Sequence, residues 1–261
     1  MLNVTGISKS YNDRELFSGV SFTVGMSDRI AVIGRNGTGK TTLFEIITGN
    51  IIPDSGSVSL RRDTAIGYLR QDVQPSSERG LLEYVSGSSD LVKDLAHKIA
   101  LVQGDLAEEQ DEETVNSLLR KLGELQSLYE VKGGYSSEHE AKIILTGMGF
   151  APSDFERPLS EFSGGWRTRI ELTRLLFLNP DILLLDEPTN YLDLETQRWF
   201  ETYLRRYRGA VLVTSHDRAF LNNVASKVIA IEDEADIYHQ GDDDTSQERR
   251  VGKACRTRWS P

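Results

Sequence analysis

The stretch from Gly34 to Thr41 constrains the fold more than any other part of this 261-residue chain. It reads Gly-Arg-Asn-Gly-Thr-Gly-Lys-Thr and fits the phosphate-loop pattern G-x-x-x-x-G-K-T. The apolar, β-branched run from Arg29 to Ile33 precedes it and is typical of a buried parallel strand. Apolar residues at helical spacing follow between Thr42 and Thr48, and Gly49 then ends the pattern. A strand, a glycine-rich loop and a helix in this order predict a nucleotide-binding α/β fold.

The residue types of the loop suit an anionic ligand. Side chains at its three glycines would keep backbone N–H groups away from phosphate oxygens. Lys40 offers a positive charge to the outer phosphates, and Thr41 offers a hydroxyl ligand to magnesium. The positive end of the dipole of a helix that begins at Lys40 faces the same anion. We therefore expect ATP and Mg²⁺ as ligands, with the nucleotide held by Gly34, Arg35, Asn36, Gly37, Thr38, Gly39, Lys40, Thr41 and Thr42.

Composition limits the alternatives. With 38% hydrophobic residues, the chain can form one large α/β domain, or one domain with an inserted lobe. We find neither a secretory signal nor an apolar run of about 18 residues, and we expect a cytoplasmic protein. The single cysteine, Cys255, excludes an internal disulfide and a cysteine metal site. The net charge of −10 argues against broad electrostatic affinity for nucleic acid.

Two kinds of strand pattern occur along the chain. Apolar and polar residues alternate near the N-terminus, at 2–5 and 20–24, which predicts an accessory sheet of half-buried antiparallel strands. Continuous apolar runs occur elsewhere, and helical segments lie between several of them. This alternation favours a parallel core sheet with helices on both faces. The predicted core strands are 65–69, 182–185, 210–213 and 228–231.

The segment 90–132 has a different pattern. Apolar residues recur every three or four positions in two runs, and the polar stretch 108–113 separates them. This predicts an antiparallel helical hairpin that projects from the domain or packs along it. The segment contains ten acidic and five basic residues. That charge is typical of a solvated surface, and a dedicated partner contact is the alternative.

Two carboxylates, Asp186 and Glu187, directly follow the apolar run 182–185. Ligands of α/β sheets bind at the carboxyl ends of such strands. Asp186 is expected to hold magnesium through its water shell, and Glu187 to polarise the water that attacks the γ-phosphate. An acidic turn after a buried strand is the alternative, and the presence of the phosphate loop disfavours it.

The string from Ser163 to Arg167, Ser-Gly-Gly-Trp-Arg, resembles the signature motif of ATP-binding cassette (ABC) proteins. With the motifs above, it makes the chain up to about Gly241 resemble one ABC nucleotide-binding domain. The resemblance implies a P-loop NTPase of the ABC ATPase type. In this fold a parallel core sheet is joined by an antiparallel β subdomain and by a helical signature subdomain. The predicted hairpin, at about 89–132, would be an insertion in the signature subdomain, and residues 242–261 would form an unstructured tail.

The resemblance also implies roles for single residues. Gln71 would contact magnesium and the attacking water, and His216 would contact the γ-phosphate. Asp193 would couple opposing sites, and Tyr11 would stack on adenine. A packing role for Tyr11 and a surface amide role for Gln71 remain as alternatives. The implied catalytic residues are Glu187, His216 and Gln71. The implied metal ligands are Thr41, Gln71 and Asp186. The residues that would face the ATP of a second cassette are Ser163, Gly164, Gly165 and Trp166.

Further strings resemble the ABC-F branch of this family. Trp166 stands where most signature motifs have glutamine, and the strings 185–190 and 215–221 resemble ABC-F sequences. The resemblance implies an Mg-dependent ATPase without a membrane domain that acts on the ribosome, in translation or in ribosome protection. ABC-F proteins resemble tandem cassettes with a helical arm inserted in the first, and the predicted hairpin falls in that interval. Tyr191 departs from the family's usual histidine.

An ABC-F chain would continue through a basic linker into a second cassette. We therefore expect a truncated first cassette, whose site is completed by a second cassette in the missing part of the chain or in a homodimer. Residues 246–261 show neither helical period nor alternation, and they resemble a translated adapter sequence. The alternative is the start of a ribosome-contacting linker.

Other functions remain open from the residues alone. The motor subunit of an ABC transporter would share every catalytic residue, and a regulatory ATP-binding module would lack significant turnover. A guanine-specific GTPase is disfavoured, because no N-K-x-D string follows the Asp186 strand. The sequence does not distinguish a translation factor from a resistance protein, nor does it name the ribosomal component that the arm would contact.

Overall fold

The computed structural model describes residues 1–11, 14–70, 77–87, 90–108, 111–131 and 134–231. The chain divides into two compact units, one of Met1–Val73 with Leu178–Pro261 and one of Gln74–Phe177. Each unit is described by itself below. Among the described helices, none combines the length and apolarity needed to cross a membrane. The predicted Gln71 and the predicted tail 242–261 lie outside the described residues.

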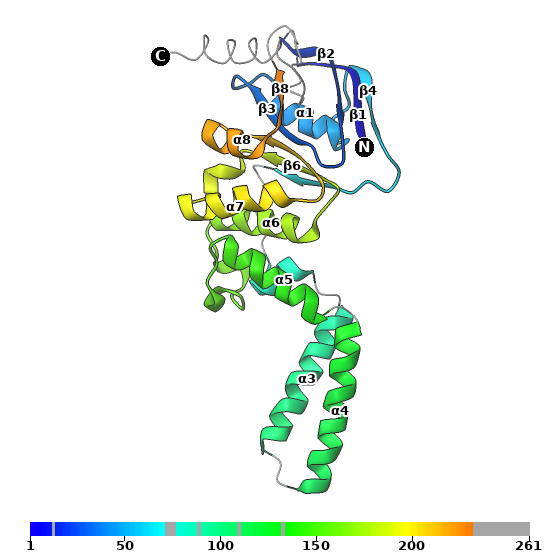
Figure 1. Ribbon diagram of the computed structural model, residues 1–261, viewed down its shortest axis with the longest axis vertical. Helices are drawn as coiled ribbons and strands as arrows, with labels where there is room; N and C mark the ends of the chain where they lie inside the picture. The colour runs from blue at the N-terminus through cyan, green and yellow to red at the C-terminus, as the bar shows by residue number, and fades with distance from the viewer. Residues whose placement is uncertain (12–13, 71–76, 88–89, 109–110, 132–133, 232–261) are drawn as a thin grey trace. The chain divides into compact units, whose positions relative to one another are not determined.

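The first unit contains a five-stranded parallel sheet (Figure 1). Its central strands are buried on both faces, which is why they read as unbroken apolar runs in the sequence. All four predicted core strands are confirmed to within one residue at each end, and the strand before the phosphate loop is confirmed as well. In spatial order the strands are β5 (Ile66–Leu69), β6 (Ile182–Asp186), β7 (Ala210–Thr214), β3 (Arg29–Gly34) and β8 (Lys227–Ile231).

A three-stranded antiparallel sheet completes the strands of this unit. Its order is β2 (Arg14–Val24), β1 (Leu2–Tyr11) and β4 (Ser55–Leu60). The predicted accessory sheet is confirmed, and β1 and β2 are longer than the alternation indicated. We did not predict β4, because only Val58 in it is even half-buried and the strand therefore has no alternating apolar face.

One hydrophobic core connects both sheets to the helix α1 (Lys40–Ile47), which follows the phosphate loop. Val4 and Phe22 of the antiparallel sheet belong to it, as does Leu212 of the parallel sheet. Leu43 and Phe44 of α1 are fully buried in the same core. The first turn of α1 is therefore held in a fixed position by the residues that follow it. The unit also contains α7 (Leu194–Arg206), α8 (Arg218–Val224) and the short 3₁₀ helix η3 (Pro188–Tyr191).

Gly56 provides a test of how closely β4 approaches β1. Its φ is +80°, and an added Cβ would lie 2.3 Å from the carbonyl carbon and oxygen of Gly6. Gly49 has a similar φ of +77°, with nothing within 4 Å of an added Cβ. We expect Gly49→Ala to lower the free energy of unfolding by about 1–2 kcal/mol, the cost of a left-handed alanine. Gly56→Ala should lower the free energy of unfolding by roughly 1–3 kcal/mol more than Gly49→Ala does, because β1 and β4 must separate.

Urea unfolding of both variants beside the unchanged protein measures this difference. Equal midpoints for the two alanine variants would contradict the close approach of β1 and β4.

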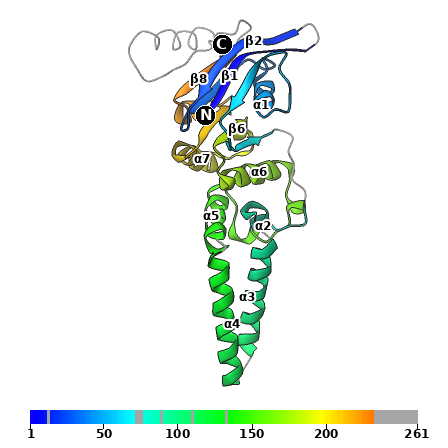
Figure 2. The ribbon, with the colours of Figure 1, turned by 90° about the vertical axis from the view of Figure 1, so that its right-hand side faces the viewer.

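The second unit is helical. Its helices α3 (Asp90–Glu108) and α4 (Glu112–Val131) lie side by side and run antiparallel, as Figures 1 and 2 show, and they match the predicted hairpin. Leu95 and Ile99 of α3 pack with Tyr129 of α4 in a small core of their own. The remaining elements of the unit are α2 (Leu81–Ser86), α5 (Gly134–Gly147), η1 (Pro152–Asp154), η2 (Leu159–Glu161) and α6 (Gly164–Leu178).

Candidate nucleotide-binding site

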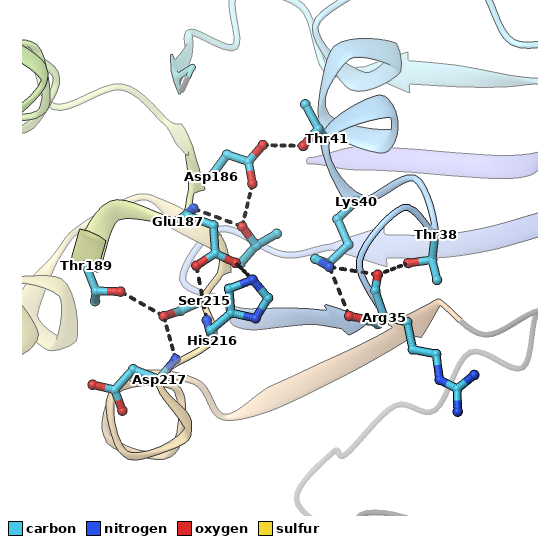
Figure 3. Close-up of polar contacts among 12 residues, drawn as sticks. Arg35, Thr38, Lys40, Thr41, Asp186, Glu187, Thr189, Ser215, His216 and Asp217 are labelled. Carbon is cyan, nitrogen blue, oxygen red and sulfur yellow. Dashed lines mark hydrogen bonds and ion pairs between the residues drawn. The ribbon is translucent and has the colours of Figure 1, made fainter. Parts of the chain in front are cut away.

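The phosphate loop connects the end of β3 to the start of α1. Gly37 and Gly39 have φ values of +79° and +96°, which L-residues with side chains rarely adopt. The Thr38 hydroxyl donates to the Arg35 carbonyl at 3.0 Å and tightens the turn (Figure 3). Gly39 is the N-cap of α1, and no side chain caps the first turn. The N–H groups of that turn are therefore suited to an anion.

Gly34 is required for a different reason from the one that the sequence indicated. A Cβ at this position would lie 2.7 Å from the Ile231 carbonyl oxygen and 2.7 Å from Thr38 Oγ1. The constraint is therefore the close packing of β3 against β8 and against the loop itself. Gly37 and Gly39 are required by their positive φ, and an added Cβ at Gly39 would also lie 2.9 Å from the Phe17 ring. Access for phosphate oxygens at these two glycines stays a prediction.

Lys40 lies along the phosphate loop. Its ammonium group donates to the carbonyl oxygens of Gly34 at 2.9 Å and Arg35 at 3.1 Å. Burial lowers the pKa of Lys40, and the nearby carboxylates of Glu187 and Asp186 act in the opposite direction. The site thus holds a partly buried positive charge that bonds to loop carbonyls and is influenced by two acids.

Asp186 connects three elements of the site. One of its carboxylate oxygens accepts from the Thr41 hydroxyl at 2.6 Å, and the other accepts from the Thr214 hydroxyl at 2.6 Å. Thr41 belongs to α1, Asp186 to β6 and Thr214 to β7, and Asp186 is only 3% exposed. A hydroxyl and a carboxylate oxygen in contact are the kind of oxygen ligands that Mg²⁺ prefers when phosphates complete its shell. These residues therefore fit the ion.

Glu187 is buried and held from two sides. Its backbone N–H donates to Thr214 Oγ1 at 3.0 Å, and its Oε2 accepts from the His216 N–H at 3.1 Å. Its Oε1 lies 3.4 Å from His216 Nε2, longer than a normal hydrogen bond, and so keeps acceptor capacity. The φ of Glu187 is +52°, a strained value for a residue with a side chain. Such strain at a buried carboxylate is typical of a functional position.

Three further predicted residues of this unit, His216, Asp193 and Tyr11, lie at or beside the ends of elements, whereas Arg35 and Asn36 lie in the phosphate loop and Thr42 in α1. His216 follows β7, and its side chain is 60% exposed. Asp193 is the N-cap of α7, where its carboxylate accepts from the Thr196 N–H at 3.0 Å. Tyr11 ends β1 and is 47% exposed, and the ammonium of Lys9 lies 5.5 Å from the centre of its ring. An exposed ring can stack on a base, and this role for Tyr11 stays a prediction.

The signature residues belong to the second unit. Gly164 begins α6. Arg167 donates to the carbonyl oxygens of Phe162 at 2.8 Å and Ser160 at 2.9 Å, which fixes the chain before the helix. Trp166 is partly exposed, with the Phe150 ring centre at 5.1 Å and the Arg169 guanidinium 4.3 Å from its own ring centre.

The comparisons with known proteins agree with these motifs. Residues 17–190 match the family model described as ABC transporter. The chain belongs to this family. It is an ATP-binding cassette of the ABC ATPase type.

The chain is similar in sequence to parts of longer proteins. It is 35% identical to ABC transporter F family member 4 of Arabidopsis thaliana, over 93% of this chain and 33% of that protein. It is 32% identical to the tylosin resistance ATP-binding protein TlrC of Streptomyces fradiae, over 88% of this chain and 42% of that protein. The chain thus spans less than half the length of these curated relatives.

A solved structure shows the same fold. It is described as the dimeric structure of a post-hydrolysis state of the ATP-binding cassette MJ0796 bound to ADP and Pi. It superposes with a TM-score of 0.63 at 19% identity, over 92% of this chain and 99% of that one. The predicted P-loop fold of the ABC ATPase type is confirmed.

The structure brings several predicted residues of the cassette together in one unit. Lys40, Thr41, Asp186, Glu187 and His216 gather around the ends of the parallel strands (Figure 3). Gln71 lies outside the described residues, so its role stays a prediction, as do the individual roles of the others.

Sequence reasoning missed Thr214. Its hydroxyl bonds to both predicted acids through the Asp186 carboxylate and the Glu187 N–H. The available signal was a polar residue ending an otherwise apolar strand, directly before Ser215 and His216.

Proposed function

We propose that the cassette is the first nucleotide-binding domain of an ABC-F ATPase that hydrolyses ATP and acts on the ribosome, in translation or in ribosome protection. The α3–α4 hairpin carries this proposal. It lies between β5 and the signature in the chain, the interval in which the ABC-F resemblance implies an inserted arm. The names of the two relatives, an F family member and a tylosin resistance protein, support the same branch.

The geometry supports ATP hydrolysis by the following roles. The ammonium of Lys40 and the first-turn N–H groups of α1 bind the outer phosphates. Thr41 and Asp186 hold Mg²⁺, which when bound neutralises charge on the phosphate oxygens. Glu187 accepts a proton from the attacking water through its Oε1, and His216 Nε2 donates to a γ-phosphate oxygen from the exposed side of the site.

A second cassette is part of the proposal. Ser163, Gly164, Gly165 and Trp166 would face the ATP of an opposing cassette, and Asp193 would couple the two sites. The MJ0796 cassette, which has the same fold, is described as dimeric, and this supports pairing. The partner is either a second cassette of a longer chain or a second copy of this one, and without it we expect slow turnover.

Ribosome binding tests the proposal. We expect the Glu187→Gln chain to co-sediment with purified ribosomes in the presence of Mg²⁺ and ATP, because a cassette that cannot hydrolyse stays in its ATP-bound form. Sucrose-gradient sedimentation with and without ATP measures this. Glu187→Gln combined with Lys40→Met is the matched control and should remain at the top of the gradient. Absence of ATP-dependent co-sedimentation would contradict the ribosomal role while leaving the ATPase role intact.

A transporter motor subunit is the second candidate, since the matching family model is itself described as ABC transporter. It would dock on a membrane partner through the cassette instead of using the hairpin. A neighbouring gene for a protein with transmembrane helices, and co-purification of that protein with this chain, would favour it.

A further inference from the structure

Gln197 of α7 is a polar residue to which the motifs assign no role. Its side-chain amide donates to Asp217 Oδ2 at 2.8 Å and approaches Glu201 Oε1 at 3.4 Å. Both N–H groups of a glutamine amide are thereby directed at carboxylates. Glu201 is buried, and its other oxygen accepts from Asn223 of α8 at 2.9 Å. Gln197 therefore sits in a polar network that joins α7 to α8.

Asp217 is the residue directly after His216. It is the N-cap of α8, where its Oδ1 accepts from the Phe220 N–H at 3.1 Å. The bond from the Phe220 N–H is the largest cause that holds the pKa of Asp217 below its ordinary value, and the bond from Gln197 is the second largest. Asp217 is thus a charged acceptor shared between the start of α8 and the side chain of Gln197.

The other end of the network reaches the segment after β6. The N–H of Gln197 donates to the Asp193 carbonyl at 2.9 Å, so the residue lies one turn after the N-cap of α7. The Thr189 and Ser215 hydroxyls are 2.9 Å apart, and Ser215 Oγ accepts from the Asp217 N–H at 3.0 Å (Figure 3). The chain segments 187–193 and 215–217 are therefore tied together by the Thr189–Ser215 hydrogen bond and by the bond from the His216 N–H to Glu187 Oε2.

His216 itself is poorly held by packing. Its side chain is 60% exposed, so burial does not define its position. Its backbone N–H bonds to Glu187, and its neighbours on both sides are held by hydrogen bonds to Thr189 and Gln197. A hydrogen bond to a charged group is about twice as strong as a neutral one, so the tie through Gln197 and Asp217 is the stronger of the two.

We propose that Gln197 is a positioning residue that, through Asp217, holds His216 in register with Glu187 and Asp193. The proposal rests on the proposed ATP hydrolysis by Glu187 and His216, and it adds a residue that acts without touching the nucleotide. A change at the N-cap of α7, where Asp193 lies, reaches His216 through the backbone bond between Asp193 and Gln197 and then through the side-chain bond from Gln197 to Asp217.

The test uses Gln197→Met, which keeps the length of the side chain and removes both donors. The matched control is Arg198→Met, an exposed position next to it on the same helix. We expect amide hydrogen exchange at His216 and Phe220 to become about tenfold faster in Gln197→Met only, the size of one lost charge-assisted bond. We expect kcat for ATP to fall by a similar factor, with the ATP dissociation constant within about twofold. Unchanged exchange at these two amides overturns the proposal.

A second variant and a double mutant separate positioning from general destabilisation. Gln197→Glu places a third carboxylate beside Asp217 and Glu201, and it should lower kcat more than Gln197→Met does; a smaller effect overturns the proposal. In a His216→Ala background, measured by single turnover of radiolabelled ATP, Gln197→Met should cause no further loss of rate. A further loss of the same factor overturns positioning through His216.

If the unchanged chain does not hydrolyse ATP, the proposed function fails, and the exchange rates still decide whether Gln197 holds the loop.

Discussion

Glu187→Gln is expected to abolish ATP turnover and to leave ATP binding intact. The amide has the size of the carboxylate and can still accept from the His216 N–H, which now bonds to Glu187 Oε2 at 3.1 Å. It cannot take a proton from water. Loss of a general base costs about 10²–10⁴-fold in rate. Phosphate release under saturating ATP and the ATP dissociation constant from calorimetry, measured on the same preparation, check both parts.

The control for this variant is Glu15→Gln, which makes the same chemical change at an exposed position of β2. It should leave both quantities unchanged. Phosphate release by Glu187→Gln at the rate of the unchanged chain would remove the catalytic assignment of Glu187. Loss of ATP binding in that variant would instead give the carboxylate a structural role, since its backbone is held in a left-handed conformation at φ +52°.

The predictable parts of the fold are those that local pattern determines. Strands buried on both faces are apolar along most of their length, and so β6 and β7 could be identified from sequence although each ends in a polar residue. The hairpin helices α3 and α4 could be identified because each must bury one stripe against the other. The strand β4 has no buried face, and it pairs with β1 through backbone bonds that leave no apolar pattern in the sequence. Pattern analysis could not find it.

The candidate site also has a part that could be predicted from the sequence and a part that could not. The loop glycines and the acids after β6 lie in strings with a fixed order, so their identity was predictable. The contacts of Thr214 with Asp186 and Glu187 join residues far apart in the chain, and the bond between Gln197 and Asp217 joins two helix starts. Such contacts depend on which strands are neighbours in the sheet, and β6 and β7 are neighbours only after folding. Sequence spacing carries no record of that.

Lys40→Met should weaken ATP binding by roughly 10- to 100-fold. The ammonium group lies at the phosphate loop, and a hydrogen bond to a charged group contributes about 1.5–3 kcal/mol, where 1.4 kcal/mol is tenfold in affinity. The methionine has similar length without charge or donors. Arg62→Met, which removes an exposed positive charge between β4 and β5, is the control and should bind ATP normally.

The pH dependence of ATP binding distinguishes Lys40 from a general loss of positive charge. Burial lowers the pKa of Lys40 below the 10.5 of an ordinary lysine, so the free chain loses this proton earlier as the pH rises. Phosphate beside the ammonium favours the charged form, and ATP binding at alkaline pH must therefore take up a proton. Affinity should fall with rising pH in the unchanged chain and in Arg62→Met. In Lys40→Met that decline and the proton uptake, measured by calorimetry in buffers of different ionisation enthalpy, should both be absent. Equal proton uptake in Lys40→Met would assign the titration to another group and remove Lys40 from the phosphate site.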